Sequence, residues 1–136
     1  MRLVLDTSVT LAWVHSDEQS AATQALLDKV AAHGAIVPAL WRLEVANALS
    51  YAVRRKRIDA THRDESLRDL SDLDITEDPE TNRHAWSATL HLAEIYGLTV
   101  YDAAYLELAQ RIRAPLATLD QDLAEAAKKA GVEVWP

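Results

Sequence analysis

Four acidic residues stand at positions in this chain where an unpaired carboxylate is costly: Asp6, Glu44, Asp102 and Asp120. Asp6 and Asp120 each follow a short apolar run. Asp102 begins an apolar helical run, and Glu44 lies within another. Dehydrating a carboxylate costs several kcal/mol unless a cation or hydrogen-bond donors compensate. If these four residues, the acidic quartet, converge in the fold, their mutual repulsion adds to this cost, and a divalent cation would relieve it.

The chemistry that such a site supports is hydrolysis of a phosphodiester. Mg²⁺ and Mn²⁺ prefer carboxylate and water ligands, and Mg²⁺ usually keeps several waters that phosphate oxygens can displace. Two acids can bind one ion directly, while the others hold a second ion or orient water. A bound ion polarises a phosphoryl oxygen, lowers the pKa of water and stabilises the leaving alkoxide.

Each acid also has an ordinary structural explanation. Asp102 and Asp120 suit the beginnings of helices, where acidic residues cap backbone N–H groups and favour the helix dipole. Asp6 suits a turn after a strand, and Glu44 can pair with a nearby arginine on the surface. The joint occurrence of all four at positions that one fold can bring together favours the metal site.

Other catalytic classes find less support. The chain has no cysteine, which excludes disulfides, thiolate zinc sites and cysteine nucleophiles. Its histidines show no ligand spacing: His84 and His91 lie about 10 Å apart along a helix at roughly 1.5 Å per residue. Three glycines are too few for a glycine-rich phosphate loop. No serine stands in a nucleophile elbow motif.

Length and composition predict one globular domain spanning residues 1–136, with 49% hydrophobic residues to build its core. The formal net charge of -7 argues against broad adhesion to nucleic acid. It does not exclude a nuclease, because bound metal ions change the sign of the local field. No run approaches the roughly 18 apolar residues of a membrane span, and no signal-like segment is evident. We therefore expect a cytoplasmic protein with no membrane association.

Short apolar runs alternate with helical patterns from end to end. The runs predict strands at residues 3–5, 35–37, 73–75, 116–119 and 132–134. Ser16 with Gln19 predicts a capping box, and Asp78-Pro79 predicts another helix start. The alternation favours an α/β fold of three layers, α/β/α, with a central mainly parallel sheet of about five short strands. Ligands bind such sheets at the carboxyl ends of the strands, where Asp6 and Asp120 are expected side by side.

The chain has one concentrated basic patch, at the end of a long helix predicted for residues 39–55. It is made by Arg54, Arg55, Lys56 and Arg57. Cations at a helix C-terminus favour the dipole and the solvent, which is the ordinary explanation. The alternative is that the patch contacts the backbone of a phosphodiester substrate near the acidic quartet.

Four segments resemble, in order, the acidic motifs of PIN-domain ribonucleases. They are LVLDTS (3–8), PALWRLEVANAL (38–49), TVYDAAYLELA (99–109) and ATLDQDL (117–123). Each motif alone is loose, but the ordered set is specific and covers essentially the whole chain. The chain is most similar to the VapC toxins of bacterial and archaeal toxin–antitoxin pairs, which are about this length.

The resemblance implies a PIN fold, endoribonuclease activity that depends on Mg²⁺ or Mn²⁺, a homodimer, and a small VapB-like antitoxin whose C-terminal segment blocks the acidic pocket. Within the quartet, Asp6 and Asp102 are expected to bind the ion directly. Glu44 and Asp120 are then expected to hold water or a second ion.

Three further positions match the family. Asp122 matches an additional acid that is often present, and Ser8 and Thr118 match hydroxyl positions that line or support the pocket.

Two other interpretations remain. The first is a PIN-domain nuclease of RNA processing outside a toxin–antitoxin pair. The second is a receiver-like regulatory domain without enzymatic activity, which needs an acidic pair after the first strand and a lysine near the last. Asp6 has no acidic neighbour, and Lys128 and Lys129 fall within a predicted helix. A phosphohydrolase with an aspartate nucleophile expects a second aspartate where Ser8 stands.

Overall fold

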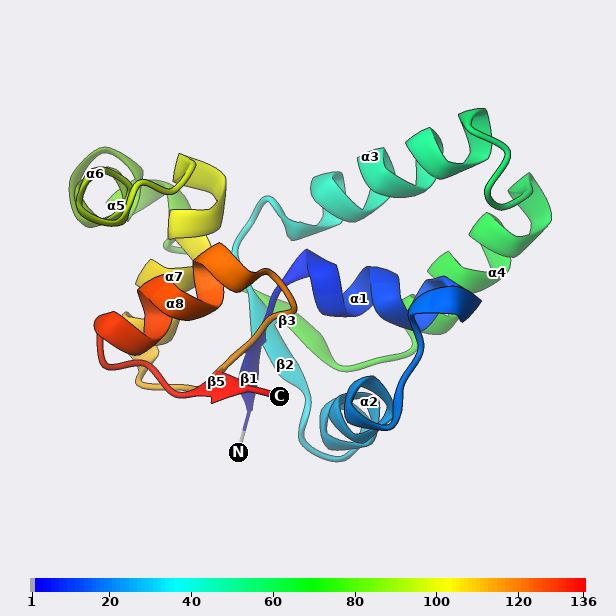
Figure 1. The fold of residues 1–136 in the computed structure, drawn as a ribbon, viewed down its shortest axis with the longest axis horizontal. Helices are drawn as coiled ribbons and strands as arrows, with labels where there is room; N and C mark the ends of the chain where they lie inside the picture. Colours follow the sequence, from blue (N-terminus) through cyan, green and yellow to red (C-terminus); the bar gives the residue numbers. More distant parts are fainter. Residues whose placement is uncertain (1) are drawn as a thin grey trace.

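The computed structural model describes residues 2–136, which form a five-stranded sheet between two layers of helices (Figure 1). The strands are β1 (Leu3–Leu5), β2 (Ala35–Val37), β3 (Ile75–Glu77), β4 (Leu116–Ala117) and β5 (Val134–Trp135). Their order is β3-β2-β1-β4-β5, and every neighbouring pair is parallel. The predicted α/β/α architecture is confirmed.

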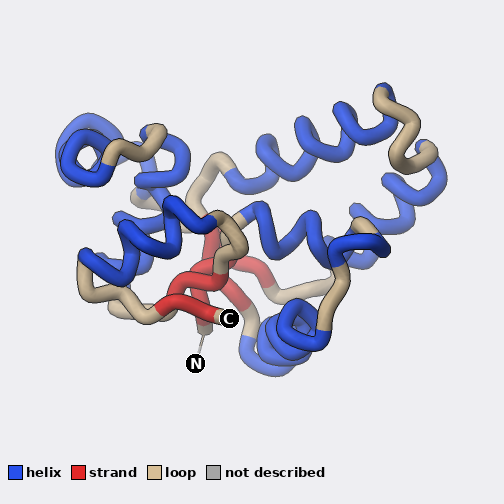
Figure 2. The backbone as a smooth tube through the Cα atoms, viewed as in Figure 1, coloured by secondary structure: helices blue, strands red, loops and turns tan. Residues whose placement is uncertain are grey.

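Helices make up most of the remaining chain, as the tube view shows (Figure 2). They are α1 (Thr7–Val14), the 3₁₀-helix η1 (Ser16–Glu18), α2 (Ala21–His33), α3 (Trp41–Arg54), α4 (Ala60–Ser71), α5 (Thr81–His84), the π-helix η2 (Ala85–Thr89), α6 (Leu90–Tyr96), α7 (Val100–Ile112) and α8 (Gln121–Lys129). In Figure 1, α7 and α8 lie on one side of the strands and α1 and α2 on the other, while α3 and α4 form a pair that extends away from the sheet. Within residues 2–136, no helix is long and apolar enough to cross a bilayer.

The strand order creates one topological switch point. From β1 the chain moves outward to β2 and β3, then returns to the other side of β1 for β4 and β5. Ligands bind open parallel sheets outside the carboxyl ends of the strands at such a point. Leu5 of β1 pairs with Ala117 of β4, so Asp6 and Thr118 follow at the same edge. The order also differs from the 2-1-3-4-5 arrangement of receiver-like folds, which contradicts that interpretation.

The central strands and α7 form the core. All three residues of β1 and all three of β2 are buried, which explains why these strands are continuous apolar runs rather than alternating ones. Helix α7 is buried along residues 103–109, so it is a central helix with little solvent-facing surface. Tyr105 within it has 0% of its surface exposed. A phenol hydroxyl at that depth needs a polar partner, and its partners lie in the site described below.

Several predicted boundaries are wrong at helix starts. Ser16 does not cap α2, because residues 16–18 form η1. The capping box lies four residues later, where Ser20 Oγ accepts a hydrogen bond from the Thr23 backbone N–H at 3.1 Å and the Ser20 N–H donates to Thr23 Oγ1 at 2.9 Å. Both possible caps are serines, and only the tertiary path of the chain distinguishes them.

The region around β3 also departs from the sequence prediction. The strand runs over Ile75–Glu77 rather than residues 73–75, and its first residue, Ile75, pairs with Ala35 of β2. The Ala35 N–H donates to the Asp74 carbonyl at 2.9 Å as the first hydrogen bond of this pairing. Asp78 is not the cap of a helix that begins at Pro79. The helix begins at Thr81, and the Asp78 carboxylate instead accepts hydrogen bonds from Arg111.

Candidate active site

Asp6 lies at the carboxyl end of β1, with only 5% of its surface exposed. Its Oδ2 accepts hydrogen bonds from Ser8 Oγ at 2.6 Å and from Thr118 Oγ1 at 2.8 Å. Burial raises the pKa of Asp6 above its ordinary value, although both hydroxyl groups and the neighbouring backbone N–H groups act in the opposite direction. The carboxylate is therefore held in place, but its charge remains energetically unfavourable because it is buried.

Ser8 and Thr118 tie the ends of β1 and β4 together. Besides donating to Asp6, Ser8 Oγ accepts from the Leu119 N–H at 2.9 Å, and Thr118 Oγ1 accepts from the Asp120 N–H at 3.1 Å. Each hydroxyl thus orients Asp6 and fixes the loop that carries Asp120. This is the placement that a supporting role for Ser8 and Thr118 requires.

Asp102 is in the first turn of α7, but it is not the helix cap. The cap is Thr99, whose Oγ1 accepts a hydrogen bond from the Asp102 N–H at 3.1 Å, so the Asp102 carboxylate is not needed for capping. The pKa of Asp102 is raised to about 6, first by burial and then by the negative charges of the other three members of the acidic quartet. Because charge repulsion weakens with distance, the other three acids lie near enough to Asp102 for their charges to act on it.

Asp120 combines both roles that the sequence left open. It is the N-cap of α8, with Oδ1 accepting from the Leu123 N–H at 2.9 Å, and its charge also acts on Asp102. Capping and membership of the quartet are therefore not exclusive for this residue.

Glu44 is held by two residues that the sequence analysis missed. Its Oε1 accepts hydrogen bonds from Tyr105 Oη at 2.5 Å and from Thr7 Oγ1 at 3.1 Å. Burial, and next the hydrogen bond to Glu44, raise the pKa of the Tyr105 phenol, so this group stays a donor. Both residues had a signal in the sequence: Thr7 follows Asp6, and Tyr105 lies three residues after Asp102, on the same helix face.

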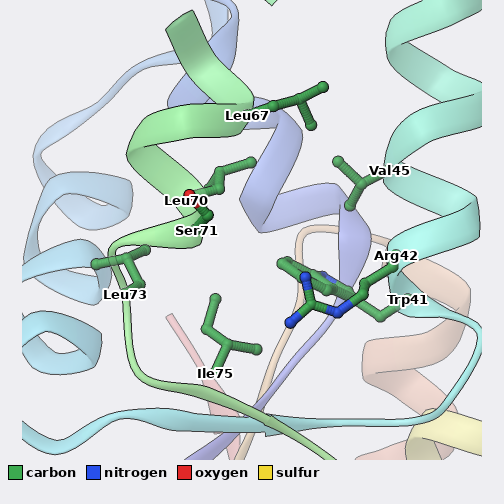
Figure 3. Close-up of a pocket in the computed structure, with 8 residues that line it drawn as sticks. All are labelled: Trp41, Arg42, Val45, Leu67, Leu70, Ser71, Leu73 and Ile75. Atoms are coloured by element: carbon green, nitrogen blue, oxygen red, sulfur yellow. The ribbon is translucent and has the colours of Figure 1, made fainter. Parts of the chain in front are cut away.

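The alternative in which Glu44 pairs with Arg42 on the surface is wrong. Arg42 Nε contacts Glu77 Oε2 at 3.3 Å, at the end of β3. Arg42 belongs to a separate recess between α3, α4 and β3 (Figure 3). The recess is lined by Trp41, Arg42, Val45, Leu67, Leu70, Ser71, Leu73 and Ile75. Arg42 therefore pairs with Glu77 and not with Glu44.

The basic patch lies at the opposite end of α3 from Glu44. Ten residues separate Glu44 from Arg54, which corresponds to about 15 Å along a helix. Arg57 binds Asp17 at 2.9 Å and Glu18 at 2.7 Å, so its charge is already matched by η1. The structure does not bring the patch to the quartet. Asp122 lies in the first turn of α8 and lines a recess between α6 and α8 with Tyr96 and Lys129.

The donor set suits a hard divalent cation, and its spacing limits how one would be held. Among residues 2–136, no three aspartate, glutamate or histidine side chains lie close enough to bind one ion together. Mg²⁺ commonly binds through one or two carboxylates and keeps several waters. The carboxylate chemistry of Asp6 and Asp102 therefore suits such an ion, with water completing its coordination.

The fold and the site define a class of protein. The family model described as PIN domain matches residues 3–129, and the chain belongs to this family. Among curated proteins, the chain is similar to "Ribonuclease VapC3" from Pyrobaculum aerophilum, with 30% identity over 125 residues that cover 92% of this chain and 94% of the relative.

Solved structures show the same fold. The crystal structure of PAE2754 from Pyrobaculum aerophilum has 25% identity and a TM-score of 0.67, covering 98% of this chain and 89% of that one. FitAcB from Neisseria gonorrhoeae has 16% identity and a TM-score of 0.68, covering 98% and 96%. VapBC2 from Rickettsia felis, bound to a DNA fragment from its promoter, has 15% identity and a TM-score of 0.65, covering 100% of both chains. The last two similarities concern the fold alone.

Proposed function

We propose that this chain is a metal-dependent endoribonuclease and the toxin of a VapBC-type toxin–antitoxin pair. The observation that carries the proposal is the pKa of Asp102, which burial and next the negative charges of Asp6, Asp120 and Glu44 raise to about 6. It indicates that four acids, distant in sequence, lie near one another at the switch point of a PIN-family sheet. The similarity to a relative named as a ribonuclease supports RNA as the substrate. Such repulsion is what a bound cation would neutralise.

Each member of the site has a role in this proposal. Asp6 and Asp102 hold Mg²⁺ or Mn²⁺, with Asp6 fixed by Ser8 and Thr118. An ion bound there would polarise the phosphoryl oxygen and lower the pKa of water. Glu44 and Asp120 orient the attacking water or hold a second ion, with Asp122 as a further secondary acid.

The partners follow from the family resemblance and from the surface around the quartet. A VapB-like antitoxin would cover the acidic pocket with its C-terminal segment. Large apolar side chains stand exposed directly before two of the acids: Leu43 is 75% exposed and Tyr101 is 65% exposed. Exposed apolar surface beside a charged cleft suits a site that a partner covers. We further propose one domain over residues 1–136, a homodimer, and action on RNA in the cytoplasm.

The test is cleavage of RNA by the purified chain with Mg²⁺ or Mn²⁺ and with a chelator. Asp6→Asn and Asp102→Asn should each lose at least about 100-fold in rate, because a catalytic metal contributes several kcal/mol to the transition state. Asp28→Asn, which changes an exposed acid on α2, should cut at the parental rate. Cleavage that persists in the chelator, or at parental rate in both site variants, would overturn the proposal.

The biological role needs a separate measurement. A small protein encoded beside this chain should bind it and suppress cleavage if the chain is a toxin. An RNA-processing nuclease of the same family would keep its activity in the presence of that neighbour.

A further inference from the structure

Glu44 differs from the rest of the acidic quartet in how it is held. Its carboxylate projects from the first turn of α3, and both hydrogen bonds that the described residues make to it fall on Oε1. A glutamate side chain has three rotatable bonds, and fixing it in one rotamer costs conformational entropy. The repulsion from the other acids favours a rotamer that leaves the site. Other contacts must therefore hold the Glu44 side chain in the site against the loss of entropy and the repulsion.

The two hydroxyl groups that contact Glu44 come from elements that carry other acids of the quartet. Thr7 begins α1 directly after Asp6, and Tyr105 lies about one turn along α7 from Asp102. Thr7 Oγ1 and Tyr105 Oη also contact each other at 2.9 Å. These three contacts share two hydroxyl protons. A carboxylate can only accept, so each contact with Glu44 needs a hydroxyl group as the donor.

We propose that Tyr105 and Thr7 are positioning residues that hold Glu44 through Oε1 against the repulsion of the other acids, and so leave Oε2 to the water or ion of the active site. The inference rests on the proposed function, because it assigns a role within that site. The Tyr105 hydroxyl is wholly buried, so its hydrogen bond competes with no solvent. A role in packing alone would need the ring and not the hydroxyl.

The experiment compares Tyr105→Phe, Thr7→Val and Thr7→Ser in RNA cleavage, each alone and combined with Glu44→Gln. Tyr105→Phe and Thr7→Val should lower kcat by about 10- to 100-fold with KM for RNA unchanged. Thr7→Ser should keep most of the parental kcat because it keeps the hydroxyl. In the Glu44→Gln background, Tyr105→Phe and Thr7→Val should each change kcat by about twofold or less, since the carboxylate that Tyr105 and Thr7 position is already altered. Tyr96→Phe is the matched control, because Tyr96 packs against the same core from α6.

A second readout needs no metal and no activity. The carboxyl ¹³C signal of Glu44, identified by its loss in Glu44→Gln, should shift in Tyr105→Phe and Thr7→Val and stay in place in Tyr96→Phe. An unchanged Glu44 signal in both variants overturns the inference, as does a loss of kcat that is equally large in the parent and in the Glu44→Gln background. A parent chain that cuts no RNA contradicts the proposed function, while the metal-free spectrum still decides whether Glu44 is held in this way.

Discussion

Asp102 shows at the level of one side chain what the acidic quartet does to the metal-free protein. Its pKa of about 6 lies above the value of about 4 expected in the unfolded chain. A carboxyl with a raised pKa in the folded state makes the fold less stable when it is ionised. The free energy of unfolding should therefore rise as the pH falls from above 6 toward 4.

Asp102→Asn removes this ionisation, so the metal-free variant should be more stable than the parent at pH 8. The gain should shrink toward pH 5, where the parent carboxyl is protonated. The favourable interaction of Asp102 with the α7 dipole offsets part of the gain. Urea unfolding at the two pH values measures the difference, with Glu65→Gln on the exposed surface of α4 as the control. A variant that is less stable than the parent at pH 8 would indicate that the interaction of Asp102 with the α7 dipole outweighs the repulsion.

A substitution of Thr118 tests whether its hydroxyl holds the Asp6 carboxylate in place. Thr118→Val keeps the shape of the side chain but removes the donor to Asp6 and the acceptor for the Asp120 N–H, so it should cost about 1–3 kcal/mol of stability and lower RNA cleavage. Thr10→Val is the matched control, because Thr10 is buried and its hydroxyl accepts a hydrogen bond from Trp41 Nε1 rather than donating to Asp6. It should lose stability without losing activity. Equal activity in the two variants would show that Thr118 does not support the active site.

Some residues of the site were predictable and others were not. A carboxylate within an apolar run is conspicuous because burying it is costly, which is how Asp6 and Glu44 were found. Tyr105 was not found, because a tyrosine within an apolar helix also suits the core. Its hydroxyl is functional only through Glu44, 61 positions away in the chain. Arg57 was predicted as an RNA contact from its charge, but sequence cannot show that Asp17 and Glu18 lie against it.

At the scale of elements, one arginine joins α7 to the end of β3. Arg111 binds Asp78 at 2.6 Å and Glu107 at 2.9 Å, and both carboxylates are buried. Burial raises the pKa of Asp78, but the hydrogen bonds from Arg111, the Glu80 N–H and Thr81 outweigh it and leave the pKa below its ordinary value. This pairing stabilises the fold above about pH 4, and the contribution is lost as the pH falls through the lowered pKa.

Arg111→Met should therefore destabilise the protein by about 3–5 kcal/mol at neutral pH, because it leaves two buried carboxylates without their cation. Arg83→Met breaks an exposed ion pair with Glu80 and should cost about 1 kcal/mol or less. Thermal unfolding of both variants measures the contrast. Similar melting temperatures would show that the buried pair adds nothing beyond a surface pair.

The same elements show why some boundaries were predictable. Strands β1 and β2 are buried on both faces, so burial appears in the sequence as an uninterrupted apolar run. Helix starts were less predictable because they depend on single hydrogen bonds. Asp78 was expected to cap a helix, yet its contact with Arg111, 33 positions away, determines its place. The π-helical segment η2 has no signal that distinguishes it from an ordinary helical turn.

At the scale of the whole molecule, the strand order makes the site. The sequence placed acids at the ends of predicted strands and helices, but it could not show that β4 returns beside β1 rather than beside β3. That return brings Thr118 and Asp120 to Asp6. The family resemblance implied a PIN fold but no strand order, since strand pairing is a property of the complete fold.

Binding of a divalent cation should stabilise the whole fold. An ion that binds only the folded state adds about 2.7 kcal/mol when its concentration is 100 times Kd, so Mg²⁺ or Mn²⁺ should raise the melting temperature of the parent. Asp6→Asn and Asp102→Asn should lose most of this increase, and Asp28→Asn should keep it. A parent chain whose melting temperature does not respond to millimolar ion would contradict a metal site in the quartet.

The central claim is that the acidic quartet forms one metal site at the carboxyl edge of the sheet. The most direct measurement is anomalous diffraction from crystals of the parent chain soaked in Mn²⁺. We expect a manganese peak in contact with Asp6 and Asp102 that is absent from crystals of Asp102→Asn. A peak located only elsewhere, or none at the quartet in crystals of a chain that still cleaves RNA, would contradict the account.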